Sequence, residues 1–153
     1  MFDSPLRPSA RFWLDPLFWT AMAAGPVCWF AIYLWQQPVL QPEWPFAEPL
    51  LFLLPVLVYP VIEEIIFRGL IQELIYRYLS CGSTGPLSTA NLLTSLLFTG
   101  AHFIHHPPLW AALVIFPSLV FGYFKDSTGR LVAPILLHVS YNAGFIWLFA
   151  APS

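Results

Sequence analysis

Charged residues are scarce in this chain of 153 residues. Lys and Arg together number 6 and Asp and Glu number 8, so charged residues make up 9% of the sequence, whereas 58% is hydrophobic. Soluble domains carry about 25% charged residues. Too few charges are present to cover a water-exposed surface, so a lipid bilayer must surround much of the chain. No run of basic residues occurs, which argues against nucleic acid as a partner.

Cysteine is also rare, and several catalytic motifs are missing. Cys28 and Cys81 are the two cysteines, and their settings predict free thiols and no disulfide framework. The zinc-protease string His-Glu-x-x-His is absent. No serine in the hydrophobic stretches has a glycine-flanked context, and no pair of aspartates occurs there. Zinc, serine and aspartyl types of membrane protease are therefore not indicated.

Long hydrophobic stretches dominate what is present. Five of them lie at about 17–35, 50–79, 89–104, 109–124 and 131–150. A strand that crosses a bilayer needs only about 10 residues of alternating polarity, and that pattern is absent. The first stretch exceeds the h-region of about 7–15 residues of a cleaved signal peptide, so it predicts a retained helix. The sequence predicts an all-α, polytopic transmembrane helix bundle with about five spans.

The basic residues predict the orientation of this bundle. With five alternating spans, the five basic residues that precede, end or follow a span all fall on one side, namely Arg7, Arg11, Arg77, Lys125 and Arg130. The opposite loops, about 36–49 and 105–108, contain no Lys or Arg. The positive-inside rule then predicts a multi-pass protein with a cytoplasmic N-terminus. We accordingly divide the chain into a cytoplasmic segment 1–16, a first transmembrane helix with its outer loop 17–49, and a core 50–153.

The second stretch is too long and too polar for a simple span. Thirty residues of helix would measure about 45 Å, against about 30 Å of hydrocarbon. Pro60 predicts a kink or break just before Glu63, because proline lacks an N–H and clashes with the preceding turn. Glu64 and Arg68 have the i, i+4 spacing of a helical ion pair. Glu63 points elsewhere and is left as the freer carboxylate, although a purely structural ion network is the alternative.

Three further polar residues fall in the later stretches. His102 ends the third stretch, and His138 and Asn142 lie on one helical face of the fifth. Histidine can transfer protons near neutral pH, and His and Asn side chains can donate hydrogen bonds to an oxyanion. Each of them alone could equally be an interhelical hydrogen-bond partner. Counting residues from the cytoplasmic loops places Glu63 and His102 at a similar depth in the membrane. The same count places His138 several ångströms less deep.

The remaining polar residues predict little chemistry. His105 and His106 are expected at the interface, with a metal-ligand role as a minor alternative. Glu73 and Arg77 have the spacing of an interfacial salt bridge. Asp126 is expected to be a loop charge.

Three strings together resemble one family. Glu-Glu-x-x-x-Arg at 63–68, Phe-x-x-x-His at 98–102 and His-x-x-x-Asn at 138–142 match, in order and spacing, the motifs of the CAAX-protease and bacteriocin-processing family, also called ABI-type or glutamic-type intramembrane proteases. The resemblance covers about residues 50–150. It implies a helical protease core without cofactor or metal. Glu63 would activate water with the help of His102. His138 and Asn142 would hold the oxyanion, and Glu64 and Arg68 would orient these groups.

The resemblance also implies a setting for the protein. Members commonly have more helices ahead of the Glu-Glu motif, so self-association or a partner subunit is left open. The substrate would be a protein or peptide in or at the membrane, with a C-terminal sorting tag or a CAAX-like sequence as examples, in a prokaryotic inner membrane. The alternatives are a metal-dependent protease that uses the same Glu and His residues, a non-catalytic immunity or scaffold protein, and a proton-coupled transporter.

Overall fold

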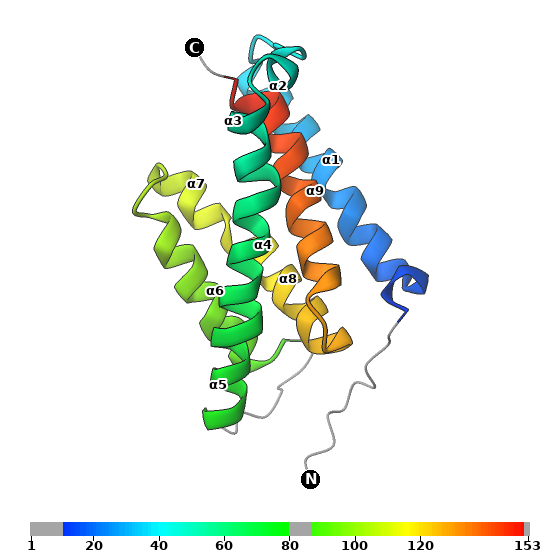
Figure 1. The fold of residues 1–153 in the computed structure, drawn as a ribbon, viewed down its shortest axis with the longest axis vertical. Helices are drawn as coiled ribbons and strands as arrows, with labels where there is room; N and C mark the ends of the chain where they lie inside the picture. Colours follow the sequence, from blue (N-terminus) through cyan, green and yellow to red (C-terminus); the bar gives the residue numbers. More distant parts are fainter. Residues whose placement is uncertain (1–10, 80–86, 152–153) are drawn as a thin grey trace.

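The computed structural model describes residues 11–79 and 87–151, and these contain helices and no strand. The N-terminal part comprises the short helix η1 (Phe12–Leu14), α1 (Pro16–Gln36) and α2 (Trp44–Ala47). One continuous helix follows as α3 (Pro49–Leu53), η2 (Leu54–Val58), α4 (Tyr59–Glu64), η3 (Ile65–Ile71) and α5 (Gln72–Leu79). The rest comprises α6 (Thr89–His102), α7 (Pro108–Leu113), α8 (Ile115–Thr128) and α9 (Val132–Phe149) (Figure 1). The predicted all-α membrane bundle is confirmed. Arg7 and Cys81 lie outside the described residues.

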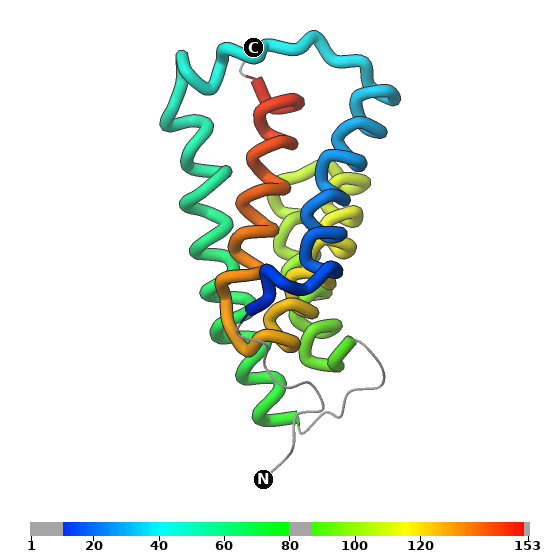
Figure 2. Tube along the Cα trace, turned by 90° about the vertical axis from the view of Figure 1, so that its right-hand side faces the viewer, coloured from blue at the N-terminus to red at the C-terminus, as the bar shows by residue number. Residues whose placement is uncertain are grey.

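The helices alternate in direction and differ in height. In Figures 1 and 2, α1 and α9 run upward, the helix from α3 to α5 runs downward, and residues 37–48 cross the upper end. The turn between α6 and α7 lies well below the upper ends of α3 and α9 in both views. The α6–α7–α8 part of the bundle is therefore shorter than the rest at its upper end.

Four of the five predicted spans are long enough to cross a bilayer. Among the described residues these are Pro16–Gln36, Pro49–Leu79, Pro108–Thr128 and Val132–Phe149. The third predicted span forms α6, which has 14 residues and ends at His102. At 1.5 Å per residue it measures about 21 Å, less than the hydrocarbon core of about 30 Å. Pro107 and Pro108 prevent α6 from resuming after the turn that follows His102, because proline cannot continue a helix and disfavours helical geometry in the residue before it.

The long helix runs without a break past Pro60, so the predicted break before Glu63 is absent. The π-helical segment η2 precedes the proline, and there the Tyr59 N–H bonds to the Leu54 carbonyl five residues back. In that pattern the N–H of residue 60 would donate a hydrogen bond to the Pro55 carbonyl. Pro60 has no N–H, so this bond is missing. Asn142 of α9 supplies the missing donor, because its Nδ2 lies 2.9 Å from that carbonyl oxygen.

An aromatic core joins α1 and α9 to α8 and holds α9 in place. Phe18 meets Phe124 edge to face at 5.6 Å between ring centroids. Higher up, a Cβ at Gly144 would lie 2.3 Å from the Trp29 ring, so only glycine permits this contact between α1 and α9. The hydroxyl of Tyr141 also donates to a carbonyl of α1. This packing positions the face of α9 that carries the polar residues.

Candidate active site

The two adjacent glutamates end α4 in opposite environments. The side chain of Glu64 is fully buried, whereas that of Glu63 is 33% exposed. Successive helical residues point about 100° apart, so one carboxylate faces the bundle interior while the other points away from it and stays partly exposed. The predicted difference between Glu64, which is committed to Arg68, and the freer Glu63 is present.

Glu64 forms the predicted ion pair with Arg68. Its Oε2 lies 3.4 Å from Arg68 Nε, and neither side chain is exposed. These two atoms have no hydrogen-bond partner, so the contact is ionic and lacks hydrogen-bond alignment. The guanidinium nitrogens Nη1 and Nη2 instead bond to other helices. Arg68 therefore links the long helix to α6 and α8 while its charge balances that of Glu64.

Two buried serines hold the Arg68 guanidinium. Nη2 donates to Ser118 Oγ at 2.6 Å and to the Ser118 carbonyl oxygen at 3.0 Å. Nη1 donates to Ser95 Oγ at 3.4 Å and to Gln72 Oε1 at 3.4 Å. The ring of Phe98 also lies 5.5 Å from the guanidinium carbon. Helices η3, α5, α6 and α8 thus converge on one arginine.

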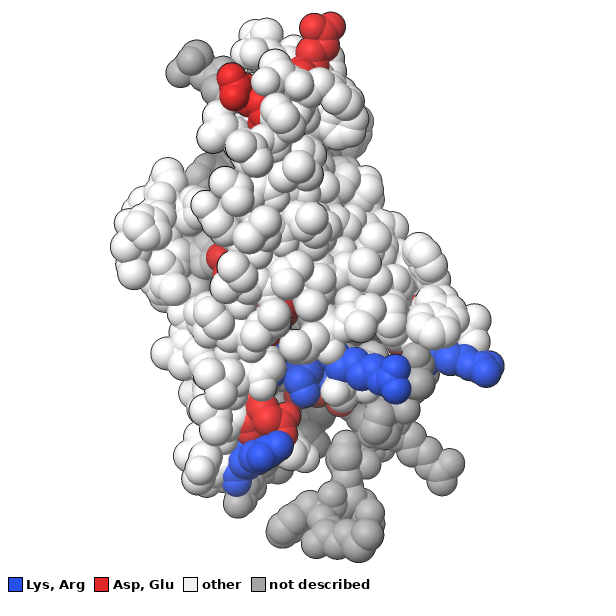
Figure 3. Space-filling view, in the orientation of Figure 1, with Lys and Arg blue, Asp and Glu red and all other residues white. Residues whose placement is uncertain are grey.

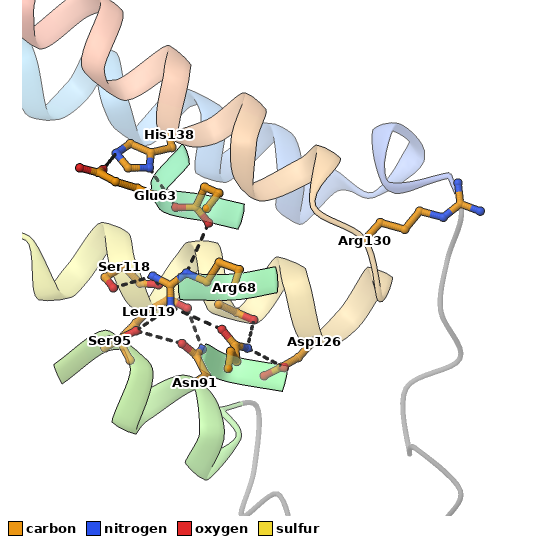
Figure 4. A network of polar contacts seen from close by, with 12 residues as sticks. Glu63, Arg68, Asn91, Ser95, Ser118, Leu119, Asp126, Arg130 and His138 are labelled. Carbon is orange, nitrogen blue, oxygen red and sulfur yellow. Dashed lines mark hydrogen bonds and ion pairs between the residues drawn. The ribbon is translucent and has the colours of Figure 1, made fainter. Parts of the chain in front are cut away.

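A second layer of polar contacts continues toward the lower end of the bundle (Figure 4). Ser95 donates to Asn91 at 3.0 Å, and Asn91 donates to the Leu119 carbonyl at 2.9 Å. Asp126 accepts from Gln72 at 2.7 Å and from Ser88 at 2.6 Å. The prediction that Asp126 is a loop charge is wrong, because α8 continues to Thr128 and carries Asp126 against α5 and α6.

The sequence prediction missed these network residues. The serines were considered only as nucleophiles, and a buried arginine needs more acceptors than one glutamate provides. The i, i+4 spacing of Asn91 and Ser95 on the face of α6 that also carries Phe98 was the available signal. We name Arg68, Gln72, Asn91, Ser95, Ser118 and Asp126 the Arg68 network.

His138 lies between the two glutamates. Its Nδ1 is 2.9 Å from Glu64 Oε1, and its Nε2 is 3.6 Å from Glu63 Oε2. The ring stacks on Phe121 with 4.8 Å between centroids. The depth deficit predicted for His138 is absent, because α5 extends below the α8–α9 turn in Figure 1 and the loops do not mark one common level.

His102 and Asn142 flank this centre. His102 Nδ1 lies 2.9 Å from the Phe98 carbonyl oxygen, which can only accept, so Nδ1 carries the hydrogen. The Phe98 ring contacts both imidazoles, at 4.5 Å from His102 and 5.9 Å from His138. Asn142, one turn above His138, uses one Nδ2 hydrogen on the Pro55 carbonyl and retains a second. All six predicted site residues thus lie around one region of the bundle.

The structure also shows where the remaining polar residues of the sequence analysis lie. Glu73 and Arg77 form the expected exposed salt bridge at 2.9 Å. His106 is exposed, and its ring stacks on His102 at 5.4 Å. Within residues 11–79 and 87–151, no group of three or more His, Cys, Asp or Glu side chains is arranged to hold a metal ion.

The fold and the site together define a polytopic membrane protein with a Glu–His–Glu centre inside its helix bundle. A family model described as type II CAAX prenyl endopeptidase Rce1-like matches residues 44–144, which include every residue of that centre. The chain belongs to this family of membrane endopeptidases, as the three motifs indicated. A comparison with curated proteins finds no match, and a comparison with solved structures finds none either.

Proposed function

We propose that the chain is a glutamate-dependent intramembrane endopeptidase in which Glu63 activates the attacking water. The observation that carries this proposal is the position of His138, with one ring nitrogen toward the buried Glu64 and the other toward the accessible Glu63. A carboxylate that fixes one side of an imidazole directs its other nitrogen at the reacting groups. Glu64 therefore has a positioning role, and Glu63 has the chemical one.

The charges of the centre balance when His138 carries two hydrogens. Glu63 and Glu64 then contribute two negative charges, and Arg68 and His138 contribute two positive ones. Such neutrality matters inside a membrane, where an unbalanced charge is expensive. The 3.6 Å between His138 Nε2 and Glu63 Oε2 exceeds a direct hydrogen bond, and a water molecule can bridge such a pair.

The proposed reaction is the addition of water to a peptide bond. The Glu63 carboxylate takes one proton from water while the water oxygen forms a bond to the carbonyl carbon. The carbonyl electron pair moves to its oxygen, which accepts hydrogen bonds from His138 Nε2 and the remaining Asn142 Nδ2 hydrogen. When the C–N bond breaks, the proton held by Glu63 passes to the leaving nitrogen. His102 Nε2, which carries no hydrogen in the neutral ring, accepts from the water and orients it.

The proposed substrate class suits a centre that lies inside a membrane-spanning helix bundle. A protein or peptide in or at the membrane can reach it, as a C-terminal sorting tag or a CAAX-like end would. A prokaryotic inner membrane is the proposed setting, and the mechanism uses side chains alone.

The test is a Glu63→Gln variant with Glu73→Gln as its matched control. Glu73 lies on the same helix, is partly exposed and is remote from His138. Both proteins are expressed in a bacterial inner membrane, and new protein termini in those membranes are identified by chemical labelling and mass spectrometry. We expect the termini produced by the unaltered chain to vanish with Glu63→Gln and to persist with Glu73→Gln. Persistence in both variants would refute Glu63 as the base.

A further inference from the structure

The Arg68 guanidinium is turned away from the glutamate whose charge it balances. Only Nε faces Glu64, at 3.4 Å from Oε2 and without a hydrogen bond. The strong arrangement of such a pair is a fork, in which two N–H groups of the arginine bond to both oxygens of one carboxylate. Here the hydrogens of Nη1 and Nη2 bond to oxygens of uncharged groups, namely those of Gln72, Ser95 and Ser118. The absence of a fork leaves Glu64 Oε1 to His138 Nδ1, which lies 2.9 Å away.

The buried amide of Gln72 has only one orientation that suits its neighbours. Its Nε2 donates to the Gly122 carbonyl at 3.1 Å and to Asp126 Oδ1 at 2.7 Å. A carbonyl and a carboxylate oxygen only accept, so the amide nitrogen must face them. The amide oxygen is thereby directed at Arg68 Nη1, which can only donate. The reverse orientation would set oxygen against acceptors and nitrogen against a donor.

Asp126 is in turn fixed by the beginning of α6. Its Oδ2 accepts from the Ser88 hydroxyl at 2.6 Å. Ser88 is the N-cap of α6 and accepts from the Asn91 N–H at 2.9 Å. Asp126 therefore belongs to α8 but is held at one position relative to α6. Figure 4 shows it at the end of the line of contacts that begins at Arg68.

We propose that Asp126 is a positioning residue for the Glu–His centre. It orients the Gln72 amide, and this amide retains Nη1 of Arg68. Glu64 thereby keeps one oxygen for His138. Without the acceptor at residue 126 the amide can turn, and the released guanidinium can form a fork with Glu64 in competition with His138. The expected effect on cleavage rests on the proposed protease function, whereas the effect on His138 does not.

Two variants remove the proposed orientation, and a conservative one keeps it. Asp126→Leu removes the acceptor, and Gln72→Met removes the amide. Asp126→Asn keeps an oxygen for Gln72 and can donate from its nitrogen to Ser88. Glu73→Gln is the matched control, because it makes the same change from carboxylate to amide at a partly exposed side chain that pairs with Arg77.

The first measurement is the proton resonance of His138 Nδ1–H in the full chain, labelled with 15N-histidine and held in detergent. The chain has 4 histidines, and His138→Gln identifies the signal by its loss. A weaker bond to Glu64 moves this resonance upfield. We expect an upfield shift in Asp126→Leu and in Gln72→Met, and none in Asp126→Asn or Glu73→Gln.

An unchanged resonance in Gln72→Met, with a retained unfolding transition, would overturn the proposal even if Asp126→Leu failed to fold. An upfield shift in Asp126→Asn as large as that in Asp126→Leu would also overturn it, because the acceptor would then not be the property that matters.

The second measurement is the yield of protein termini that depend on Glu63. We expect Asp126→Leu and Gln72→Met each to lower it about tenfold, the effect of losing one hydrogen bond to a charged group. The double variant should be no worse than either, because both changes remove the same link. Losses that multiply in the double variant would show that Asp126 does not act through Gln72. If the resonance shifts as expected in a chain that produces no Glu63-dependent termini, the protease function fails and the positioning role stands.

Discussion

The helix from Pro49 to Leu79 carries two Glu–Arg pairs with the same spacing in different surroundings. Glu73 and Arg77 approach to 2.9 Å with side chains 36% and 70% exposed, whereas Glu64 and Arg68 are 3.4 Å apart and fully buried. The shorter contact is the weaker constraint, because water and counter-ions compensate each exposed charge separately. In the buried pair, each charge depends on the protein for compensation. Burial, not distance, therefore decides which pair organises the site.

The largest expected effect follows from removing the charge of the buried pair. Arg68→Met keeps an unbranched side chain but leaves Glu64 without its counter-charge and frees the acceptors of Ser95 and Ser118. Loss of one partner of a buried pair costs about 3–5 kcal/mol. We expect the unfolding temperature in detergent to fall sharply, together with a loss of Glu63-dependent cleavage. An unfolding temperature within 1 °C of the unaltered protein would show that the network does not depend on this charge.

Close packing beneath Arg68 predicts a second, smaller effect. A Cβ at Gly122 would lie 1.8 Å from Asn91 Oδ1, so Gly122→Ala must displace the Asn91 side chain. The displacement removes the bond that Asn91 donates to the Leu119 carbonyl and the bond that it accepts from Ser95. Overpacking of this kind costs about 1–3 kcal/mol. The unfolding temperature in detergent measures the loss, with Gly100→Ala as the control because its Cβ meets nothing within 4 Å.

A double variant sharpens this test. In Asn91→Ala/Gly122→Ala the added methyl group no longer meets the amide, so the two substitutions should be less damaging together than their separate effects predict. Strict additivity would contradict the idea that contact with Asn91 is the reason for glycine at this position.

These regions also differ in how far the sequence predicted them. The Glu64–Arg68 pair could be read from spacing, because an i, i+4 contact is local to one helix. The approach of His138 to Glu63 could not, because it depends on the relative heights of α4 and α9, and loop positions do not report these heights. The role of Asp126 required knowing that α8 runs to Thr128. The bond from Asn142 to the Pro55 carbonyl required the π-helical pattern before Pro60, which leaves an acceptor that no sequence pattern reveals.

The smallest expected effect belongs to the exposed pair and completes the comparison. Arg77→Met removes the partner of Glu73 at the same spacing and with the same substitution as Arg68→Met. Exposed pairs contribute about 0–1 kcal/mol, and Lys125 lies 3.5 Å from the same carboxylate as a second counter-charge. We expect the unfolding temperature in detergent and the Glu63-dependent cleavage to stay close to those of the unaltered chain. If Arg77→Met destabilised the protein as much as Arg68→Met, burial would not be the property that separates the two pairs, and the organising role assigned to the buried one would lose its physical basis.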